Sequence, residues 1–293
     1  MSSEPGAAGP ALTAALRADI DRLLGAEPDV RADAEVSVHQ MRVATRRLRS
    51  VLRSYKRLLD SDAAGRMRTE SAWLAGLLGV ARDAEVRAAR FADLLDRYAE
   101  KDSTAWDPTY ERLVGAERDR YRTAHDAVLA ALDSPRLRTF RGELEQWRTD
   151  PPLDSSVSGS PADEIFTAVL RSDRRRLRRL IRAEPTAAPA DKVELLHDIR
   201  KSAKRLRYSC EAAAPVLGEF ATGLGGRAKH LQTVLGDHRD AVESLEALRE
   251  HAAAVHAEGA DPHLYRVLAD AEETAAGRCL ARYPEAAAAI DKS

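Results

Sequence analysis

Apolar residues recur at spacings of three and four along most of the chain, and long runs of alternating apolar and polar residues are absent. This spacing places apolar side chains on one face of an α-helix, whereas strict alternation is typical of a half-buried strand. The pattern therefore predicts an all-α protein. We expect helices over residues 12–26, 35–60, 63–79, 81–100, 106–133, 136–149, 163–184, 191–214, 217–235, 238–257 and 261–282.

One long stretch, RTDPPLDSSVSGSPADE at residues 148–164, interrupts the helical pattern near the middle of the chain. Its proline, serine and glycine content is typical of a flexible connector. The first residues also lack a helical pattern. We therefore predict a disordered N-terminus over 1–11, a first helical bundle over 12–149, a flexible linker over 150–162 and a second helical bundle over 163–285.

The two halves of the chain repeat each other. VHQMRVATRRLRS at 38–50 aligns with LHDIRKSAKRLRY at 196–208, and LLGVARDAE at 77–85 aligns with VLGDHRDAV at 234–242. The offsets are 158 and 157 residues, so the matches are collinear. Collinear matches at nearly equal offsets indicate a tandem duplication of a helical unit. The matched pairs include His39 with His197, Arg42 with Arg200, Arg46 with Lys204, Arg47 with Arg205 and Arg49 with Arg207.

Basic residues form a second stripe beside the apolar stripe of each matched helix. A third basic run at 170–182 places its arginines on the same flank. The expected apolar stripes are Met41, Thr45, Leu48, Leu52, Tyr55 and Leu59; Phe166, Leu170, Leu177 and Ile181; and Ile199, Ala203, Leu206 and Cys210. The basic stripes are His39, Arg42, Arg46, Arg49 and Arg53; Arg171, Arg174, Arg178 and Arg182; and His197, Arg200, Lys204 and Arg207.

Like charges three or four residues apart on a helix repel each other, and no acid relieves this repulsion between residues 39 and 57. One interpretation is a set of solvated faces whose acids lie on neighbouring helices. The repetition of the stripes favours an anion-binding surface instead. Stripes of guanidinium groups suit bidentate contacts to phosphate oxygens. The motifs of single-phosphate sites, GxxxxGK[ST] and GxGxxG, do not occur.

Recognition of nucleic-acid bases would need amides or aromatic platforms among the arginines. Gln40 is the one amide near the first stripe, and Tyr55 and Tyr208 are the aromatic residues beside the stripes. A polyanion without bases fits this composition better.

At these residues the sequence resembles the CHAD family, the conserved histidine α-helical domain, over about residues 12 to 285. The resemblance implies two helical bundles related by pseudo-two-fold symmetry around a basic central groove or pore. It also implies binding of inorganic polyphosphate and association with polyphosphate granules in bacteria. By matched position, the implied binding residues are the three basic stripes. The Glu-x-Glu-x-Lys strand of the triphosphatase domain often fused to CHAD domains does not occur, which predicts a stand-alone binding domain.

The histidines and the Leu-Gly-x-x-Arg-Asp segments each have alternative interpretations. His39 and His197 could contact phosphate, cap a helix start or bind a metal, although metal sites need three or four converging ligands. Gly79 and Gly236 are predicted to end helices. Asp83 and Asp240 would then lie in the first turn of the next helix. Arg82 and Arg239 would either pair across the bundle, a structural role, or face the ligand.

Three functions follow. The first is non-catalytic polyphosphate binding, with no cofactor and no metal. The alternatives are binding of a nucleic-acid backbone and, less favoured, a metal-dependent phosphohydrolase that uses the paired histidines. No nucleophile elbow or paired catalytic carboxylates occur. No apolar run is long enough for a membrane span. The isolated Cys210 and Cys279 fit a reducing cytoplasm, so we expect a cytoplasmic, granule-associated protein.

The net charge of −1 hides a strong separation of charge. Residues 39–57, 170–182 and 197–208 together sum to +17, and the rest of the chain sums to −18. Such a separation would steer polyanions to the basic stripes and repel them elsewhere.

Overall fold

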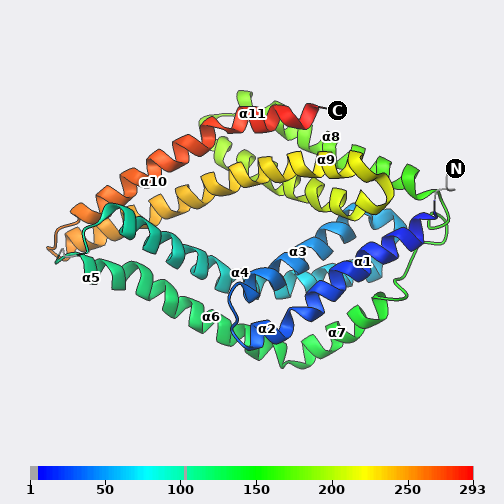
Figure 1. The fold of residues 1–293 in the computed structure, drawn as a ribbon, viewed down its shortest axis with the longest axis horizontal. Coiled ribbons are helices and arrows are strands. Elements are labelled where there is room, and N and C mark those ends of the chain that lie inside the picture. Colours follow the sequence, from blue (N-terminus) through cyan, green and yellow to red (C-terminus); the bar gives the residue numbers. More distant parts are fainter. Residues whose placement is uncertain (1–5, 102–103, 293) are drawn as a thin grey trace. The chain divides into compact units, whose positions relative to one another are not determined.

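The computed structural model describes residues 6–101 and 104–292, and helices account for nearly all of this part of the chain (Figure 1). Within it no strand forms; two isolated bridges, Ala7 with Pro161 and Leu59 with Leu153, are the β-type pairings. The prediction of an all-α fold is confirmed. The α-helices are α1 (Ala8–Gly25), α2 (Glu27–Arg31), α3 (Ser37–Ser54), α4 (Ser61–Tyr98), α5 (Trp106–Tyr110), α6 (Ala116–Leu132), α7 (Pro135–Trp147), α8 (Ala162–Ala183), α9 (Pro189–Ala257), α10 (His263–Ala281) and α11 (Tyr283–Ala288).

Short helical turns connect several of these elements. Three are 3₁₀ turns, η1 (Lys56–Leu58), η3 (Glu184–Thr186) and η4 (Ala289–Asp291), and η2 (Glu111–Gly115) is a π-turn between α5 and α6.

Gly79 and Gly236 do not end helices, so that prediction is wrong. Gly79 lies inside α4 and Gly236 lies inside α9, and neither is among the glycines with positive φ. A glycine inside a helix costs only about 1 kcal/mol relative to alanine. The neighbouring Leu78 and Leu235 are buried, and their packing outweighs that cost. Asp83 and Asp240 consequently lie within helices rather than in first turns.

Helix α9 contains a sharp break at Gly218, close to the break predicted between residues 214 and 217. Gly218 has φ 54° and ψ −130°, and Pro215 lies just before it. Proline removes a backbone donor, and the positive φ favours glycine, so the helical ladder is interrupted here. The chain folds back after Gly218, and this places the backbone at Gly225 against the side chain of Cys210.

The chain divides into two compact units, and each combines segments from both halves of the sequence. Unit 1 consists of Met1–Gly79 and His125–Lys229, and unit 2 consists of Val80–Ala124 and His230–Ser293. These units differ from the predicted bundles over 12–149 and 163–285, which follow the sequence halves. The repeat is a relation between the sequences of the two halves, whereas the units are defined by which segments pack together. A pseudo-two-fold relation between the halves stays a prediction.

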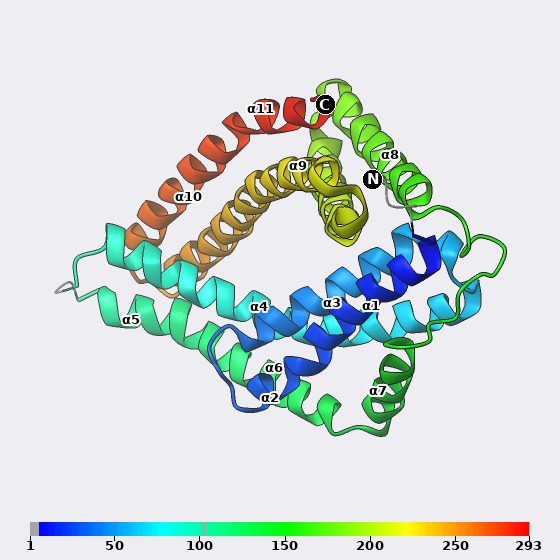
Figure 2. The ribbon, with the colours of Figure 1, turned by 45° about the vertical axis from the view of Figure 1, so that its right-hand side comes forward.

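The core of unit 1 is built from the apolar stripes of α1, α3, α8 and the first part of α9. Helix α1 packs against α3, α7 and α8, and it lies beside α3 in both Figure 1 and Figure 2. The expected stripes of α3 and α9 are buried throughout; in α8, Ile181 is only half-buried, while Asp173 joins the buried positions. The Tyr55 ring lies 4.6 Å from the Phe166 ring, and its hydroxyl donates to the carbonyl of Ser209.

The segment predicted as a flexible linker is held by backbone hydrogen bonds within unit 1. The amides of Asp60 and Asp154 pair with the carbonyls of Pro152 and Leu58. The amides of Ala8 and Gly9 bond to carbonyls at Ser160 and Ser158. A Cβ atom on Gly9 would lie 2.9 Å from Leu153, so the close approach requires glycine there.

The N-terminus also differs from the prediction of disorder over 1–11. Helix α1 begins at Ala8, four residues before the expected start, and the side chain of Ala8 is fully buried. Residues 1–5 lie outside the described residues.

Unit 2 has its own apolar core and a buried ion pair. Phe91 and Leu95 of α4 pack with Leu248 of α9 and Leu268 of α10. Helix α10 lies along the C-terminal part of α9 (Figure 2). Arg90 binds Glu272, whose side chain is 1% exposed, and this bond raises the pKa of the Arg90 guanidinium.

Candidate anion-binding site

All thirteen predicted binding residues lie on three helices of unit 1. Helix α3 carries His39, Arg42, Arg46, Arg49 and Arg53; α8 carries Arg171, Arg174, Arg178 and Arg182; and α9 carries His197, Arg200, Lys204 and Arg207.

A cavity of about 790 Å³ in unit 1 brings part of this set together with basic residues that the stripes did not include. Arg46, Arg49, Arg53 and Lys204 are the predicted residues that line it. Helix α4 adds Arg68, α8 adds Arg176, and α9 adds Lys201 and Arg205. Eight basic side chains from four helices therefore face one space, which we call the basic cavity. Its other lining residues are Ser50, Gly65, Thr69, Ala72, Asp198 and Ser202.

The arginines of the basic cavity raise one another's electrostatic energy. Burial lowers the pKa of the Arg53 guanidinium, and four neighbouring arginines lower it further: Arg205, Arg68, Arg176 and Arg49. Burial, followed by the charge of Arg68, likewise lowers the pKa of Arg49. Guanidinium groups stay charged near neutral pH even so. The cavity therefore holds uncompensated positive charge that a bound anion would neutralise.

One acid, Asp198, also lines the basic cavity. Its carboxylate lies 2.6 Å from the Lys201 ammonium group, one turn away on α9. Glu194 lies 3.6 Å from the same ammonium group. Two acids of its own helix therefore lie close to Lys201 and offset its charge.

Arg205 is held in place by an ion pair with a buried acid, Asp173. The Arg205 Nη2 atom lies 2.8 Å from Asp173 of α8, whose side chain is 3% exposed. The Arg205 Nε atom donates to the Ser54 hydroxyl of α3 at 3.0 Å. The Ser54 and Ser209 hydroxyls donate to the second Asp173 oxygen at 2.7 and 2.8 Å. This network links α3, α8 and α9 beside the basic cavity.

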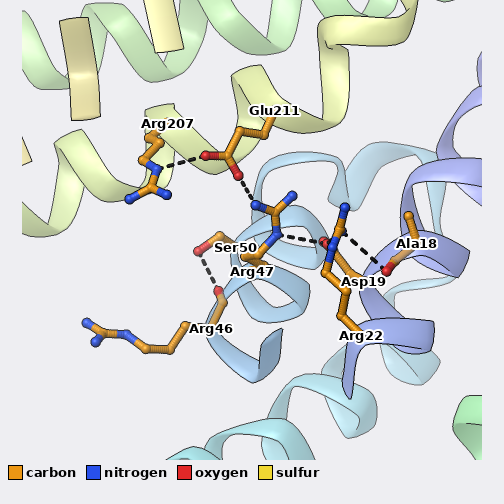
Figure 3. Close-up of polar contacts among 8 residues, drawn as sticks. All are labelled: Ala18, Asp19, Arg22, Arg46, Arg47, Ser50, Arg207 and Glu211. Atoms are coloured by element: carbon orange, nitrogen blue, oxygen red, sulfur yellow. Dashed lines mark hydrogen bonds and ion pairs between the residues drawn. The ribbon is translucent and has the colours of Figure 1, made fainter. Parts of the chain in front are cut away.

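Arg47, the residue aligned with Arg205, is anchored in a similar way (Figure 3). Its Nε donates at 2.9 Å to Asp19 of α1, which is also 3% exposed. Burial raises the pKa of the Asp19 carboxyl, and Arg47 and Arg22 oppose that rise. The other end of the Arg47 guanidinium binds Glu211 of α9.

Comparison with known proteins places these residues in a family. The profile of the CHAD domain matches residues 14–249, which is most of the chain. The chain belongs to the CHAD family.

Two curated relatives come from Mycobacterium tuberculosis: uncharacterized protein MT2285 of strain CDC 1551 / Oshkosh and uncharacterized protein Rv2226 of strain ATCC 25618 / H37Rv. Each is 36% identical over 290 residues, and each alignment covers 95% of this chain and 53% of the relative. The chain thus spans about half the length of these relatives.

Two solved structures share the fold. PptA from Streptomyces chartreusis superimposes with a TM-score of 0.78 at 20% identity, covering 96% of this chain and 99% of that one. The CHAD domain from the plant Ricinus communis superimposes with a TM-score of 0.70 at 20% identity, covering 99% and 94%. At this identity the likeness concerns the fold.

Several CHAD motif residues lie outside the basic cavity. Arg42 is half-buried over helix α4, with Nε 3.7 Å from where a Cβ atom on Gly79 would lie. Arg207 donates to Glu211. The lining of the basic cavity also excludes His197, Arg200, Arg171, Arg174, Arg178 and Arg182.

On helix α8 the predicted arginines and the arginine that lines the basic cavity lie on opposite flanks of the apolar stripe. Phe166, Leu170 and Leu177 of that stripe are buried. Arg176 lies on one side of that stripe and the predicted arginines lie on the other. The apolar pattern gives the inward face, but it does not tell which flank meets the neighbouring helices. The sequence also contains a match that the basic stripes do not use. LTAALRAD at 12–19 matches FTAVLRSD at 166–173, and this match aligns the two buried acids, Asp19 and Asp173.

The histidines occupy different surroundings. His39 is exposed and lines a separate cavity of about 470 Å³ with Arg22, Gln40 and Arg47. His197 is half-buried on α9. Among residues 6–101 and 104–292, no three His, Cys, Asp or Glu side chains lie together as metal ligands would. The two histidines therefore lack the converging donors of a tight metal site.

Arg82 and Arg239 of the Leu-Gly-x-x-Arg-Asp segments form ion pairs along their own helices. Arg82 lies 2.8 Å from Glu85, and Arg239 lies 2.5 Å from Glu243. These pairs lie within one helix, so pairing of these arginines across the bundle stays a prediction. Within the described part of the chain, no helix has the length and apolar composition needed to cross a membrane.

Proposed function

We propose that this CHAD domain binds inorganic polyphosphate without catalysis, and that the ligand lies in the basic cavity of unit 1. The observation that carries the proposal is the convergence of eight basic side chains from four helices on one space of about 790 Å³. The lowered pKa values of Arg49 and Arg53 support it, because burial and then neighbouring arginines disfavour the charged forms of these groups, and a bound anion would relieve both effects. Membership of a family associated generally with polyphosphate supports it independently.

The chemistry of the lining favours a phosphate polymer over a nucleic acid. None of the described lining residues is aromatic or carries a side-chain amide. Stacked bases and base edges would therefore find no specific partner here. The guanidinium groups that line the cavity suit phosphate oxygens, whereas the hydroxyls of Ser50 and Thr69 already donate to carbonyls of their own helices.

The row of arginines along α3 suits several consecutive phosphates rather than one. Arg46, Arg49 and Arg53 follow one side of α3 over about 10 Å, at a rise of 1.5 Å per residue. A chain lying along them would meet a guanidinium group at each turn of the helix.

Direct binding measurements test the proposal. Wild-type protein should bind long-chain polyphosphate with an affinity that falls steeply as salt rises, because each contact releases counterions from the polyanion. Replacement of Arg176 by Glu should weaken binding by about tenfold or more, equivalent to ~1.4 kcal/mol. Arg179→Glu is the matched control, since Arg179 is exposed on the same helix and does not line the basic cavity.

Competition separates the proposal from its alternatives. RNA of equal total charge should compete much less well than polyphosphate. Equal competition would favour a nucleic-acid-backbone function instead. Release of inorganic phosphate on addition of metal ions, abolished by His39→Ala, would overturn the non-catalytic proposal in favour of a hydrolase.

We further infer that polyphosphate binding directs the protein to polyphosphate granules in the cytoplasm. A fluorescent fusion should concentrate on granules in a bacterium that accumulates polyphosphate. The Arg176→Glu fusion should stay diffuse, and the Arg179→Glu fusion should behave as the wild type. Diffuse fluorescence of a wild-type fusion that binds polyphosphate in solution would remove the granule role.

A further inference from the structure

We propose that Asp173 is a positioning residue for the anion site: it holds the guanidinium of Arg205 so that the free side of that group faces bound phosphate. The inference rests on the proposed function, polyphosphate binding in the basic cavity. Asp173 itself does not line the cavity; it lies behind Arg205 and is 3% exposed.

The geometry of Arg205 divides its donors into two sets. A guanidinium group carries five N–H bonds in one plane. The contacts to Asp173 and Ser54 use the Nε atom and one N–H of Nη2. The remaining N–H bonds belong to Nη1 and the outer side of Nη2. Because Arg205 lines the basic cavity, these bonds are the ones available to a phosphate group.

Asp173 is itself held in place, so it can fix the plane of Arg205. Two hydroxyls donate to its Oδ2 atom, that of Ser54 on α3 and that of Ser209 on α9. Oδ1 binds Arg205. An arginine held in advance loses little conformational freedom when the ligand binds. Its planar group then meets phosphate oxygens in a defined orientation.

The aligned acid Asp19 provides a natural control. It is equally buried, follows the matching segment of α1 and binds Arg47, the residue aligned with Arg205. Arg47 does not line the basic cavity, and Glu211 occupies the other end of its guanidinium. The Asp19–Arg47 pair thus has the same local chemistry without the exposure to the basic cavity.

The direction in which loss of the Asp173 charge changes the affinity for polyphosphate distinguishes positioning from simple electrostatics. Removal of the Asp173 charge makes the cavity more positive, so electrostatics alone would tighten polyphosphate binding. Loss of positioning weakens it, because Arg205 is then free to adopt orientations that do not meet the ligand.

The test compares Asp173→Asn with Asp19→Asn in the full chain, by titration with long-chain polyphosphate across a range of salt and by thermal unfolding. We expect both variants to lose stability. Asp173→Asn should lose about tenfold in affinity and about one unit in the slope of log affinity against log salt, as when one phosphate contact is lost. Asp19→Asn should stay within twofold of wild type. In an Arg205→Ala background, Asp173→Asn should have no further effect on binding.

Equal or tighter binding by folded Asp173→Asn would overturn the inference, and so would an equal loss in Asp19→Asn. If Asp173→Asn does not fold, Arg205→Lys decides, since it keeps the charge but loses the planar group. Arg205→Lys should weaken polyphosphate binding about as much as is expected for Asp173→Asn. If Arg205→Lys bound with wild-type affinity, the positioning role of Asp173 would be rejected. Failure of the wild-type protein to bind polyphosphate would instead reject the proposed function.

Discussion

Arg207 donates a hydrogen bond from Nε to Glu211, 2.8 Å away and one turn further along α9. The other oxygen of the same carboxylate binds Arg47 of α3. Figure 3 shows Arg46 and Arg207 extending to the same side of this cluster. Glu211 thus binds an arginine from each of the two aligned motifs. An anion that approached Arg207 would have to displace this carboxylate.

Replacement of Glu211 by Gln should therefore strengthen polyphosphate binding while it lowers stability. The change removes a negative charge beside Arg207, whereas Arg47 keeps its ion pair with Asp19. A gain of about threefold, ~0.7 kcal/mol, would match the size of a partly exposed ion pair. Titration and thermal unfolding of the same variant would measure the two effects.

Glu219→Gln is the control for the loss of one acid, since Glu219 is exposed on α9 beyond the break at Gly218. It should change affinity much less. If Glu211→Gln and Glu219→Gln bound polyphosphate equally, Arg207 would have no part in binding.

The sequence predicted the interior of unit 1 well because burial imposes a regular period. Met41, Leu48 and Leu52 had to lie on one face of α3, and they are buried. Arg46, Arg49 and Arg53 then had to lie on the outer side, where the basic cavity is found. These predictions needed only the geometry of one helix.

The remaining cavity residues depend on how helices pack, and a single helix does not contain that information. Arg68 and Arg176 come from segments that were not aligned in the repeat, and they meet α3 only in the folded unit. Asp173 stood in the sequence as one acid within a basic run, and its burial gives it a partner in Arg205. Gly79 was predicted to end a helix because the sequence alone does not show its contact with Arg42, which lies on another helix.

Crowding of cations in the basic cavity should cost stability when no anion is bound. Arg53→Gln removes a charge whose pKa is lowered by burial and then by neighbouring arginines. We expect the ligand-free variant to be more stable by about 0.5 kcal/mol, a typical size for relief of repulsion between partly exposed charges. Its affinity for polyphosphate should fall. Chemical denaturation with and without polyphosphate would measure both.

Arg57→Gln is the control, since Arg57 is exposed just after α3 and does not line the cavity. It should leave stability nearly unchanged. A loss of stability in Arg53→Gln would mean that the packing of the arginine stem outweighs the repulsion.

The close approach at Gly225 should make two adjacent glycines respond differently to alanine. A Cβ atom on Gly225 would lie 3.0 Å from the Cβ of Cys210, whereas one on Gly226 would meet nothing within 4 Å. Both replacements gain about 1 kcal/mol of helix propensity. Gly226→Ala should therefore raise the melting temperature, and Gly225→Ala should be less stable than it by about 1–3 kcal/mol, as for overpacking of a tight contact. Equal stabilities would show that the two parts of α9 can separate at this point.

The buried thiol of Cys210 should make stability depend on pH in the alkaline range. Burial raises the pKa of this thiol from its ordinary value of 9.0 to about 12, and the carboxylates of Asp173 and Glu211 act in the same direction. Below pH 9 the thiol is protonated in both the folded and the unfolded chain, so its contribution is fully present. Above pH 9 the unfolded chain ionises first, and stability is lost as pH rises towards 12. Denaturation curves between pH 8 and 11 should show a shallower decline of stability for Cys210→Ala than for wild type.

Cys279→Ala tests whether the effect is specific: Cys279 is only half-buried, so its removal should flatten the decline less. A thiol-exchange reagent at pH 8 should label Cys279 in the folded protein and Cys210 only after unfolding. Rapid labelling of Cys210 under native conditions would show that the α3, α8 and α9 junction opens far more readily than its buried contacts imply.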